Sequence, residues 1–159
     1  MANTQALCSQ FKIDALNGQH VFGAAAGFIR ASTAADTFKA AIYLASATVN
    51  AATTAYSATG EVANSGSYAA GGPTVTWITP AQNAPAATTN AGSTTYTTLS
   101  ASLVVTTFTA TAFDAILIYN STTGKAVSVH TFGSQTITAG TFTLTMPTND
   151  QTTGLIRIT

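Results

Sequence analysis

Short runs of alternating apolar and polar residues dominate the second half of the chain. Apparent strands lie near residues 97–108, 112–120, 126–132, 141–146 and 154–158, with turns between them at short intervals. Residues 141–146 alternate with a period of two, so Phe142, Leu144 and Met146 should face inward while three threonines meet water. Several short strands at this spacing predict an all-β fold, a β-sandwich or barrel in which jelly-roll-like connections are compatible with the pattern.

A hairpin is the clearest local feature. The apolar run 116–119 and the strand-like run 127–129 flank Asn120-Ser121-Thr122-Thr123-Gly124, a set of turn residues that ends in glycine. The same residues contain the N-glycosylation pattern Asn120-Ser121-Thr122. We interpret them as the turn itself, because residues 1–5 lack the basic start and the apolar segment of a secretory signal.

The first half of the chain is less regular. Apolar residues from Gln5 to Asn17 recur at spacings of three and four, which predicts a short amphipathic helix within residues 1–18. Residues 20–35 have no clear period and are predicted to be a loop. A buried strand is expected over residues 36–44, a loop with a brief helix over residues 45–58, and a half-buried strand over residues 74–78.

Residues 79–95 combine two prolines with many Ala, Asn, Thr and Ser residues, so they predict an exposed loop. The chain shows no internal repeat and no domain boundary. Residues 1–159 are therefore expected to form one β-rich structural domain.

Charge is the most unusual property of the composition. Charged residues make up 6% of the chain, against roughly 25% in ordinary soluble domains, and the formal net charge is zero. Charge normally keeps copies of a soluble protein dissolved and apart, so a surface without it suits permanent assembly, in this case into a homo-oligomer. The threonine that replaces charge favours strands whose outer face is solvated.

Several partner classes are not expected. No apolar run approaches the 18 residues or so that a membrane span requires, and the five basic residues form no patch for nucleic-acid phosphates. A single cysteine, Cys8, cannot form an intramolecular disulfide, and packing in the core is the expected role of its side chain.

The supply of titratable groups is thin for catalysis, and we expect no enzyme activity, no cofactor and no metal site. His130 and Asp114 could meet across the hairpin as part of a Ser-His-Asp arrangement, but no nucleophile-elbow motif is present. Gly124-Lys125 resembles the end of a phosphate loop only superficially. An aromatic platform for sugars is conceivable from Trp77, Tyr43, Tyr56, Tyr68, Tyr96 and Tyr119, although such residues more often fill a core.

Ordered motifs along most of the chain carry a family resemblance. The first are Phe11-Lys12 with Leu16, Gly18 and His20, followed by residues 36–43. The most specific stretch is residues 53–62, followed by Gly66, Tyr68 and Ala70-Gly71-Gly72. Residues 116–120, 125–129, 132–133, 139–144 and 155–158 continue the similarity, whereas residues 23–35 and 79–95 depart from it.

Taken together, these motifs resemble a family of small structural proteins of tailed bacteriophages. This resemblance implies a virion component, assembled in the cytoplasm of the bacterial host, with no catalytic residues to carry over. We expect a capsid decoration or cement protein that contacts the major capsid protein and copies of itself, with a homotrimer suited to a threefold site. The alternative is a receptor- or glycan-binding module on the tail or on a head fibre. The expected partner contacts are Phe11, Lys12, Pro80, Gln82, Asn83 and Pro85, from the helix and the 79–95 loop.

Overall fold

The computed structural model describes residues 3–16, 20, 22, 36–78, 81–82 and 95–158. Its elements are β1 (Ala6–Leu7), α1 (Ser9–Leu16), β2 (Phe38–Leu44), β3 (Thr74–Val75), β4 (Ala81–Gln82), β5 (Thr95–Thr97), β6 (Leu103–Asn120), β7 (Ala126–Leu144) and β8 (Ile156–Ile158). The larger sheet has the order β1-β7-β6-β2-β3 and the smaller sheet the order β4-β5-β8. All paired strands are antiparallel. The predicted all-β class with a short N-terminal helix is confirmed.

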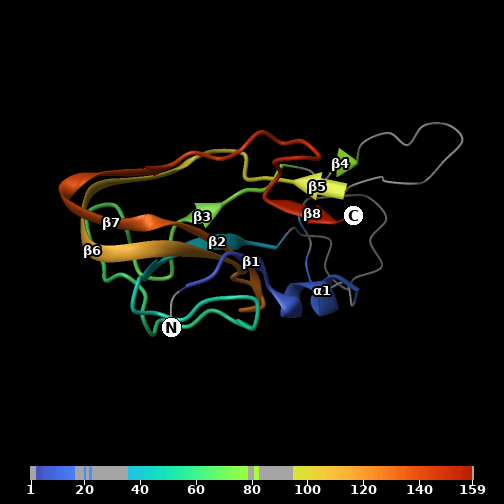
Figure 1. The fold of residues 1–159 in the computed structure, drawn as a ribbon, viewed down its shortest axis with the longest axis horizontal. Helices are drawn as coiled ribbons and strands as arrows, with labels where there is room; N and C mark the ends of the chain where they lie inside the picture. Colours follow the sequence, from blue (N-terminus) through green and yellow to red (C-terminus); the bar gives the residue numbers. More distant parts are fainter. Residues whose placement is uncertain are drawn as a thin grey trace, which may run out of the picture.

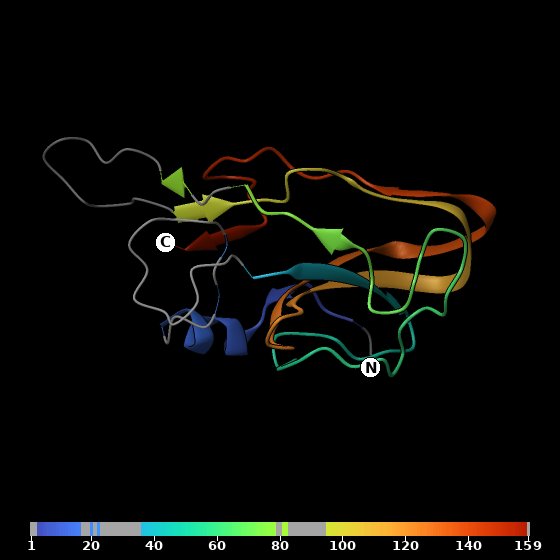
Figure 2. The ribbon, with the colours of Figure 1, turned by 180° about the vertical axis from the view of Figure 1, so that it is seen from behind.

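One long hairpin builds most of the molecule. Four predicted strands merge into two, β6 and β7, which pair from Leu103↔Leu144 to Tyr119↔Ala126. Figure 1 shows both strands running to one end of the molecule, turning there and returning along the other layer, and Figure 2 shows the same bend from behind. The hairpin turn itself, predicted at residues 120–124, is confirmed, and Gly124 has a positive φ of 76° in it.

Irregular pairing produces the bend. The register between β6 and β7 shifts repeatedly between Val105 and Ala115, and Thr107, Ala112 and Ala139 have positive φ angles. Bulges of this kind bend a strand and increase its twist. The predicted strands are interrupted at residues 109–111 and 133–140, within this irregular part of the hairpin, so the sequence pattern predicts separate strands where the backbone continues.

Aromatic side chains fill the inside of the bend. Phe113 contacts Phe108 with ring centroids 5.4 Å apart and Phe142 with centroids 5.2 Å apart, both edge to face. Phe108 and Phe113 are fully buried, and Phe142 is 6% exposed. The predicted inward direction of Phe142 is therefore confirmed.

The strand expected over residues 36–44 is observed as β2, between β6 and β3. Ala40, Ala41 and Ile42 are completely buried, as suits a strand covered on both faces. Residues 74–78 form a shorter strand than predicted, since β3 ends at Val75 and Trp77 makes only an isolated bridge to Leu99.

The N-terminal helix begins later than predicted, at Ser9 rather than near Gln5. Ala6 and Leu7 instead pair with Ser128 and Val129 as strand β1. The open edge of β7 offers these two residues backbone partners, and this tertiary pairing prevails over the helical spacing of their side chains.

Two loop predictions also need correction. Residues 45–58 contain turns and no helix in the structure; the Asn50 carbonyl and side chain accept the N–H groups of Thr53 and Ala52 there. Within the predicted 79–95 loop, Ala81–Gln82 and Thr95 belong to strands β4 and β5, which pair with each other. The rest of that loop, and most of the loop predicted at residues 20–35, lie outside the described residues.

Candidate functional site

A network of tyrosines around Glu61 lies within residues 56–71. Glu61 Oε2 accepts the Tyr56 hydroxyl at 2.5 Å. Its Oε1 accepts the Tyr68 hydroxyl at 2.6 Å and the Gly71 N–H at 2.6 Å. One carboxylate therefore ties together three points of the 56–71 segment.

The same network fastens this segment to the large sheet. The Tyr68 hydroxyl accepts the N–H of Ile42 on β2 at 2.8 Å. Tyr119 on β6 stacks against Tyr56, with centroids 4.6 Å apart, and donates its hydroxyl to the Gly71 carbonyl at 2.8 Å. Burial, and then the hydrogen bond to Glu61, raises the pKa of Tyr56 and Tyr68 well above the usual value, so the phenols stay neutral and act as braces.

A second buried polar cluster lies beside the helix. Asn120 is fully buried, and its amide nitrogen lies 2.8 Å from Asp36 Oδ2 and 3.1 Å from His20 Nδ1. On the far side of the ring, His20 Nε2 faces Asp14 Oδ2 at 3.8 Å, and Asp14 also accepts the Gln10 amide. These contacts bring residue 20 and the helix together on the end of β6.

Asn120 also organises the hairpin turn. Its side-chain oxygen accepts the N–H groups of Thr122 at 2.9 Å and Thr123 at 3.2 Å. The interpretation of residues 120–122 as a turn is therefore confirmed. A fully buried asparagine with both ends engaged has no room for a glycan.

The structure does not bring the suggested catalytic residues together. His130 Nε2 lies 2.9 Å from the Ser128 hydroxyl on its own strand, whereas Asp114 accepts the side-chain amide of Asn3 at 2.5 Å. Among the described residues, no group of three or more His, Cys, Asp or Glu side chains could hold a metal ion. Cys8 is buried as expected, and burial raises the pKa of its thiol to about 11.

The aromatic residues considered for a sugar platform mostly face the interior. Tyr43, Tyr68, Tyr119 and Trp77 are each 5% exposed or less. Tyr56 and Tyr96 are half-buried. The described part of the chain therefore presents no open row of aromatic rings.

The predicted partner contacts have different outcomes. Phe11 is 3% exposed and packs edge to face against Phe22, so it is a core residue and not available at the surface. Its neighbour Lys12 is exposed. Gln82 lies in β4, while Pro80, Asn83 and Pro85 lie outside the described residues.

Two long stretches of the chain contain no Asp, Glu, Lys or Arg. The composition alone showed only that charge is scarce overall. Residues 62–113 contain no Asp, Glu, Lys, Arg or His, and residues 126–149 contain only His130. Together these ranges include most of β6 and all of β7. The two strands of the bent hairpin therefore carry only Asp114 and His130 of these residue types.

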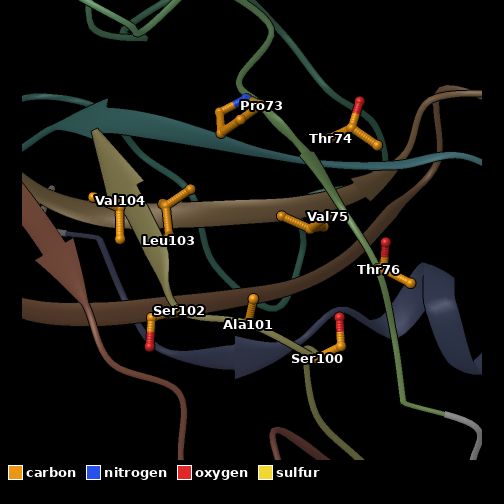
Figure 3. Close-up of a pocket in the computed structure, with 9 residues that line it drawn as sticks. All are labelled: Pro73, Thr74, Val75, Thr76, Ser100, Ala101, Ser102, Leu103 and Val104. Atoms are coloured by element: carbon orange, nitrogen blue, oxygen red, sulfur yellow. The ribbon is translucent and has the colours of Figure 1, made fainter. Parts of the chain in front are cut away.

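A cavity of about 270 Å³ opens where β3 and the start of β6 diverge. Figure 3 shows its two walls, which are formed by Pro73, Thr74, Val75 and Thr76 and by Ser100, Ala101, Ser102, Leu103 and Val104. The walls meet where the Ser100 N–H donates to the Thr76 carbonyl at 2.8 Å. Val104, one of the lining residues, is 52% exposed, so one wall of the cavity presents an apolar side chain to solvent.

Strand β7 has an open edge. On the side away from β6, the described residues provide only β1 as a partner strand, opposite Ser128 and Val129. The lack of Lys, Arg, Asp and Glu along the strand is the one signal of this edge in the sequence. Only the pairing order of the sheet shows which edge is open.

Comparison with protein-family models, with curated proteins and with solved structures gave no match. The likeness to tailed-phage virion proteins therefore stays a prediction from the motifs. Helix α1 has eight residues and is too short to cross a bilayer. The described residues contain no helix that is long and apolar enough to span a membrane.

Proposed function

We propose that this chain is a structural protein of a tailed-phage virion, a capsid decoration protein that binds the head shell and stabilises it. The observation that carries the proposal is the bent hairpin, whose strands contain one carboxylate, Asp114, and no Lys or Arg, and leave backbone edges open to a partner. Monomeric proteins usually block such edges with charge or cover them. An uncharged open edge suits a protein that remains in contact with others.

The proposed partners are the major capsid protein and copies of the chain itself, arranged as a homotrimer at a threefold site. Binding adds buried interface between neighbouring shell subunits, and any partner that binds only the assembled state stabilises that state. Because the site repeats over the shell, modest contacts sum to a large effect. No step requires catalysis or a cofactor.

The motif resemblance supports the same proposal. Its most specific stretch coincides with the network around Glu61, which fixes the 56–71 segment on β2 and β6. That network is structural in character, since its tyrosines are half-buried or buried and brace backbone groups. A rigidly held segment of this kind suits a protein that stabilises a shell.

The test is to add the purified chain to heads of the parent phage that lack it. We expect the chain to co-sediment with the heads, to raise their thermal disruption temperature, and to appear by electron cryo-microscopy over the capsid lattice. Density confined to the tail or to a head fibre would favour the adhesion module instead. Absence from the particle would contradict both functions.

A deletion of residues 80–90 tests the predicted loop contacts separately. If Pro80, Gln82, Asn83 and Pro85 contact the shell, the deletion variant should lose head binding while keeping its circular dichroism spectrum. The exposed Lys12 can be tested by Lys12→Ala. Unchanged binding of either variant would remove its segment from the interface.

A further inference from the structure

The outer edge of β7 is the largest unpaired strand edge in the described part of the chain. Strand β1 covers only Ser128 and Val129, and β7 continues to Leu144. Along residues 130–144, no described strand pairs on the side away from β6. Each strand edge carries backbone donors and acceptors that water or another strand must satisfy.

The usual protections against edge pairing are missing from the last part of this strand. No Lys, Arg, Asp or Glu occurs in residues 126–149, and the nearest proline, Pro147, follows the strand. Register shifts bend β7 up to the step between Phe108↔Gly140 and Val105↔Phe142. Beyond this step, Val105↔Phe142, Val104↔Thr143 and Leu103↔Leu144 pair in an unbroken register, so the edge is straight over residues 142–144, directly after Thr141.

We infer that two copies of this chain pair antiparallel through the outer edges of their β7 strands at residues 141–144. Antiparallel pairing of a strand with its own copy is isologous, so each unpaired donor meets an unpaired acceptor across a two-fold axis. The layer formed by β6 and β7 then continues into the second copy. This inference adds a self-contact to the proposed function. It rests on that function in one respect, namely that copies of the chain meet on the same shell.

Side chains along this edge suit a copy of the same strand. Thr141 and Thr143 are exposed on one face, and Phe142 is buried on the other. Threonine pairs across strands are favourable, whereas like charges directly opposite each other are not. With a formal net charge of zero, two copies approach without long-range repulsion.

The two-fold contact differs from the threefold contact of a trimer. A cyclic trimer uses two different surfaces of each subunit, whereas edge pairing uses one surface twice. Copies joined by β7 therefore occur in even numbers, as dimers or as two trimers linked together.

The first experiment replaces both exposed threonines of the edge. In Thr141→Lys/Thr143→Lys, paired strands would place lysines opposite lysines, so we expect the molar mass from light scattering to fall to half that of the wild type. The matched control is Val104→Lys, which lies opposite Thr143 but one strand inward. It should keep the wild-type mass, with circular dichroism confirming the fold of each variant.

A second experiment reports the contact without weakening it. The double variant Thr141→Cys/Thr143→Cys should give a disulfide-linked dimer under mild oxidation, because it places a cysteine opposite a cysteine whether the two-fold axis lies at Phe142 or at Thr143. The background is low because Cys8 is buried. Val104→Cys should remain monomeric on a non-reducing gel. Equal cross-linking of Val104→Cys, or a wild type that is purely monomeric or trimeric, would overturn the inference.

Head binding of the same variants separates the two proposals. A wild type that pairs through β7 but does not bind heads would leave the inference standing and reject the decoration function. In the opposite case, the wild type and the lysine variant bind heads equally and have the same molar mass in solution. That result would reject the edge contact and leave the decoration function in place.

Discussion

At the scale of single residues, the Glu61 side chain joins three separate groups of the 56–71 segment. Its two oxygens accept three hydrogen bonds from Tyr56, Tyr68 and Gly71. Bonds to a charged acceptor are stronger than neutral ones. The segment that bears these residues has little regular structure of its own. The hydrogen bonds to this carboxylate therefore hold the segment in place where the hydrogen bonds of a β-sheet are missing.

Replacing Glu61 by Gln should lower the free energy of unfolding by about 2–3 kcal/mol, because a neutral amide loses the charge and presents an N–H₂ group to donors. Tyr56→Phe is the matched control. It removes only the 2.5 Å bond from the half-buried ring and should cost about 1 kcal/mol. Urea titration followed by circular dichroism measures both, and equal effects would contradict the central role of Glu61.

His130 should make the protein sensitive to acid. Burial lowers its pKa from 6.5 to about 4, so between these values the unfolded chain binds a proton that the folded chain does not. The stability that this residue provides is therefore complete above pH 6.5 and is lost as the pH falls toward 4. In His130→Gln, the urea midpoint should fall less over this range; an identical pH profile would exclude His130 as a cause.

At the scale of elements, turns and bulges decide how the strands meet. Gly72 and Gly124 have the same φ of 76°, but they stand in different surroundings. A Cβ on Gly72 would lie 2.0 Å from the Ala40 carbonyl oxygen, whereas a Cβ on Gly124 would meet nothing within 4 Å. Gly72 thus allows the chain to pass against β2, and Gly124 only allows the hairpin to turn.

These two glycines form a matched pair for mutation. Gly124→Ala should cost roughly 1–2 kcal/mol, the strain of a left-handed alanine. Gly72→Ala adds a backbone clash that no rotamer relieves, so we expect loss of soluble folded protein. Expression yield and the urea midpoint measure the effect of each substitution. Similar values for the two variants would show that Gly72 does not pack closely against Ala40.

The bend in the hairpin depends on the aromatic cluster that fills it. Phe108 is fully buried and contacts Tyr68, Phe113 and Phe142. Phe108→Ala should therefore destabilise the fold by roughly 3–5 kcal/mol. The exposed Val104 provides a control, since Val104→Ala removes little buried surface and should leave the denaturation midpoint almost unchanged.

At the scale of the whole molecule, the missing charge governs behaviour. With a formal net charge of zero and only 6% charged residues, long-range electrostatics contributes little to folding or association. Contacts must rest on backbone hydrogen bonds and buried apolar surface, which salt does not screen.

Head binding and self-association should therefore persist when the NaCl concentration is raised from about 0.1 M to 1 M, although the Debye length falls from about 10 Å to 3 Å. Sedimentation with heads at both concentrations measures this. Release at high salt would show that charged residues, such as the exposed Lys12, carry the contact.

Much of the fold could be predicted from local pattern, because strand alternation and turn residues act over a few positions. Strand β2, the hairpin turn at Asn120 and the inward direction of Phe142 followed from such signals. The merging of strands across residues 109–111 and 133–140 could not, since bulges depend on the partner strand. Nor could the pairing of Ala6 and Leu7 with β7, or the convergence of three groups on Glu61, because each joins residues that the sequence spacing does not relate.

The order of the sheet also has a consequence for synthesis. Apolar strand β2 pairs mainly with β6, which begins at Leu103, so more than half of the chain must leave the ribosome before β2 gains its principal neighbour. The tight turn after Asn120 then brings β6 and β7 together with little loss of chain entropy. The nascent chain thus carries an unpaired apolar strand until its final third arrives, and truncated products should aggregate rather than accumulate as soluble fragments.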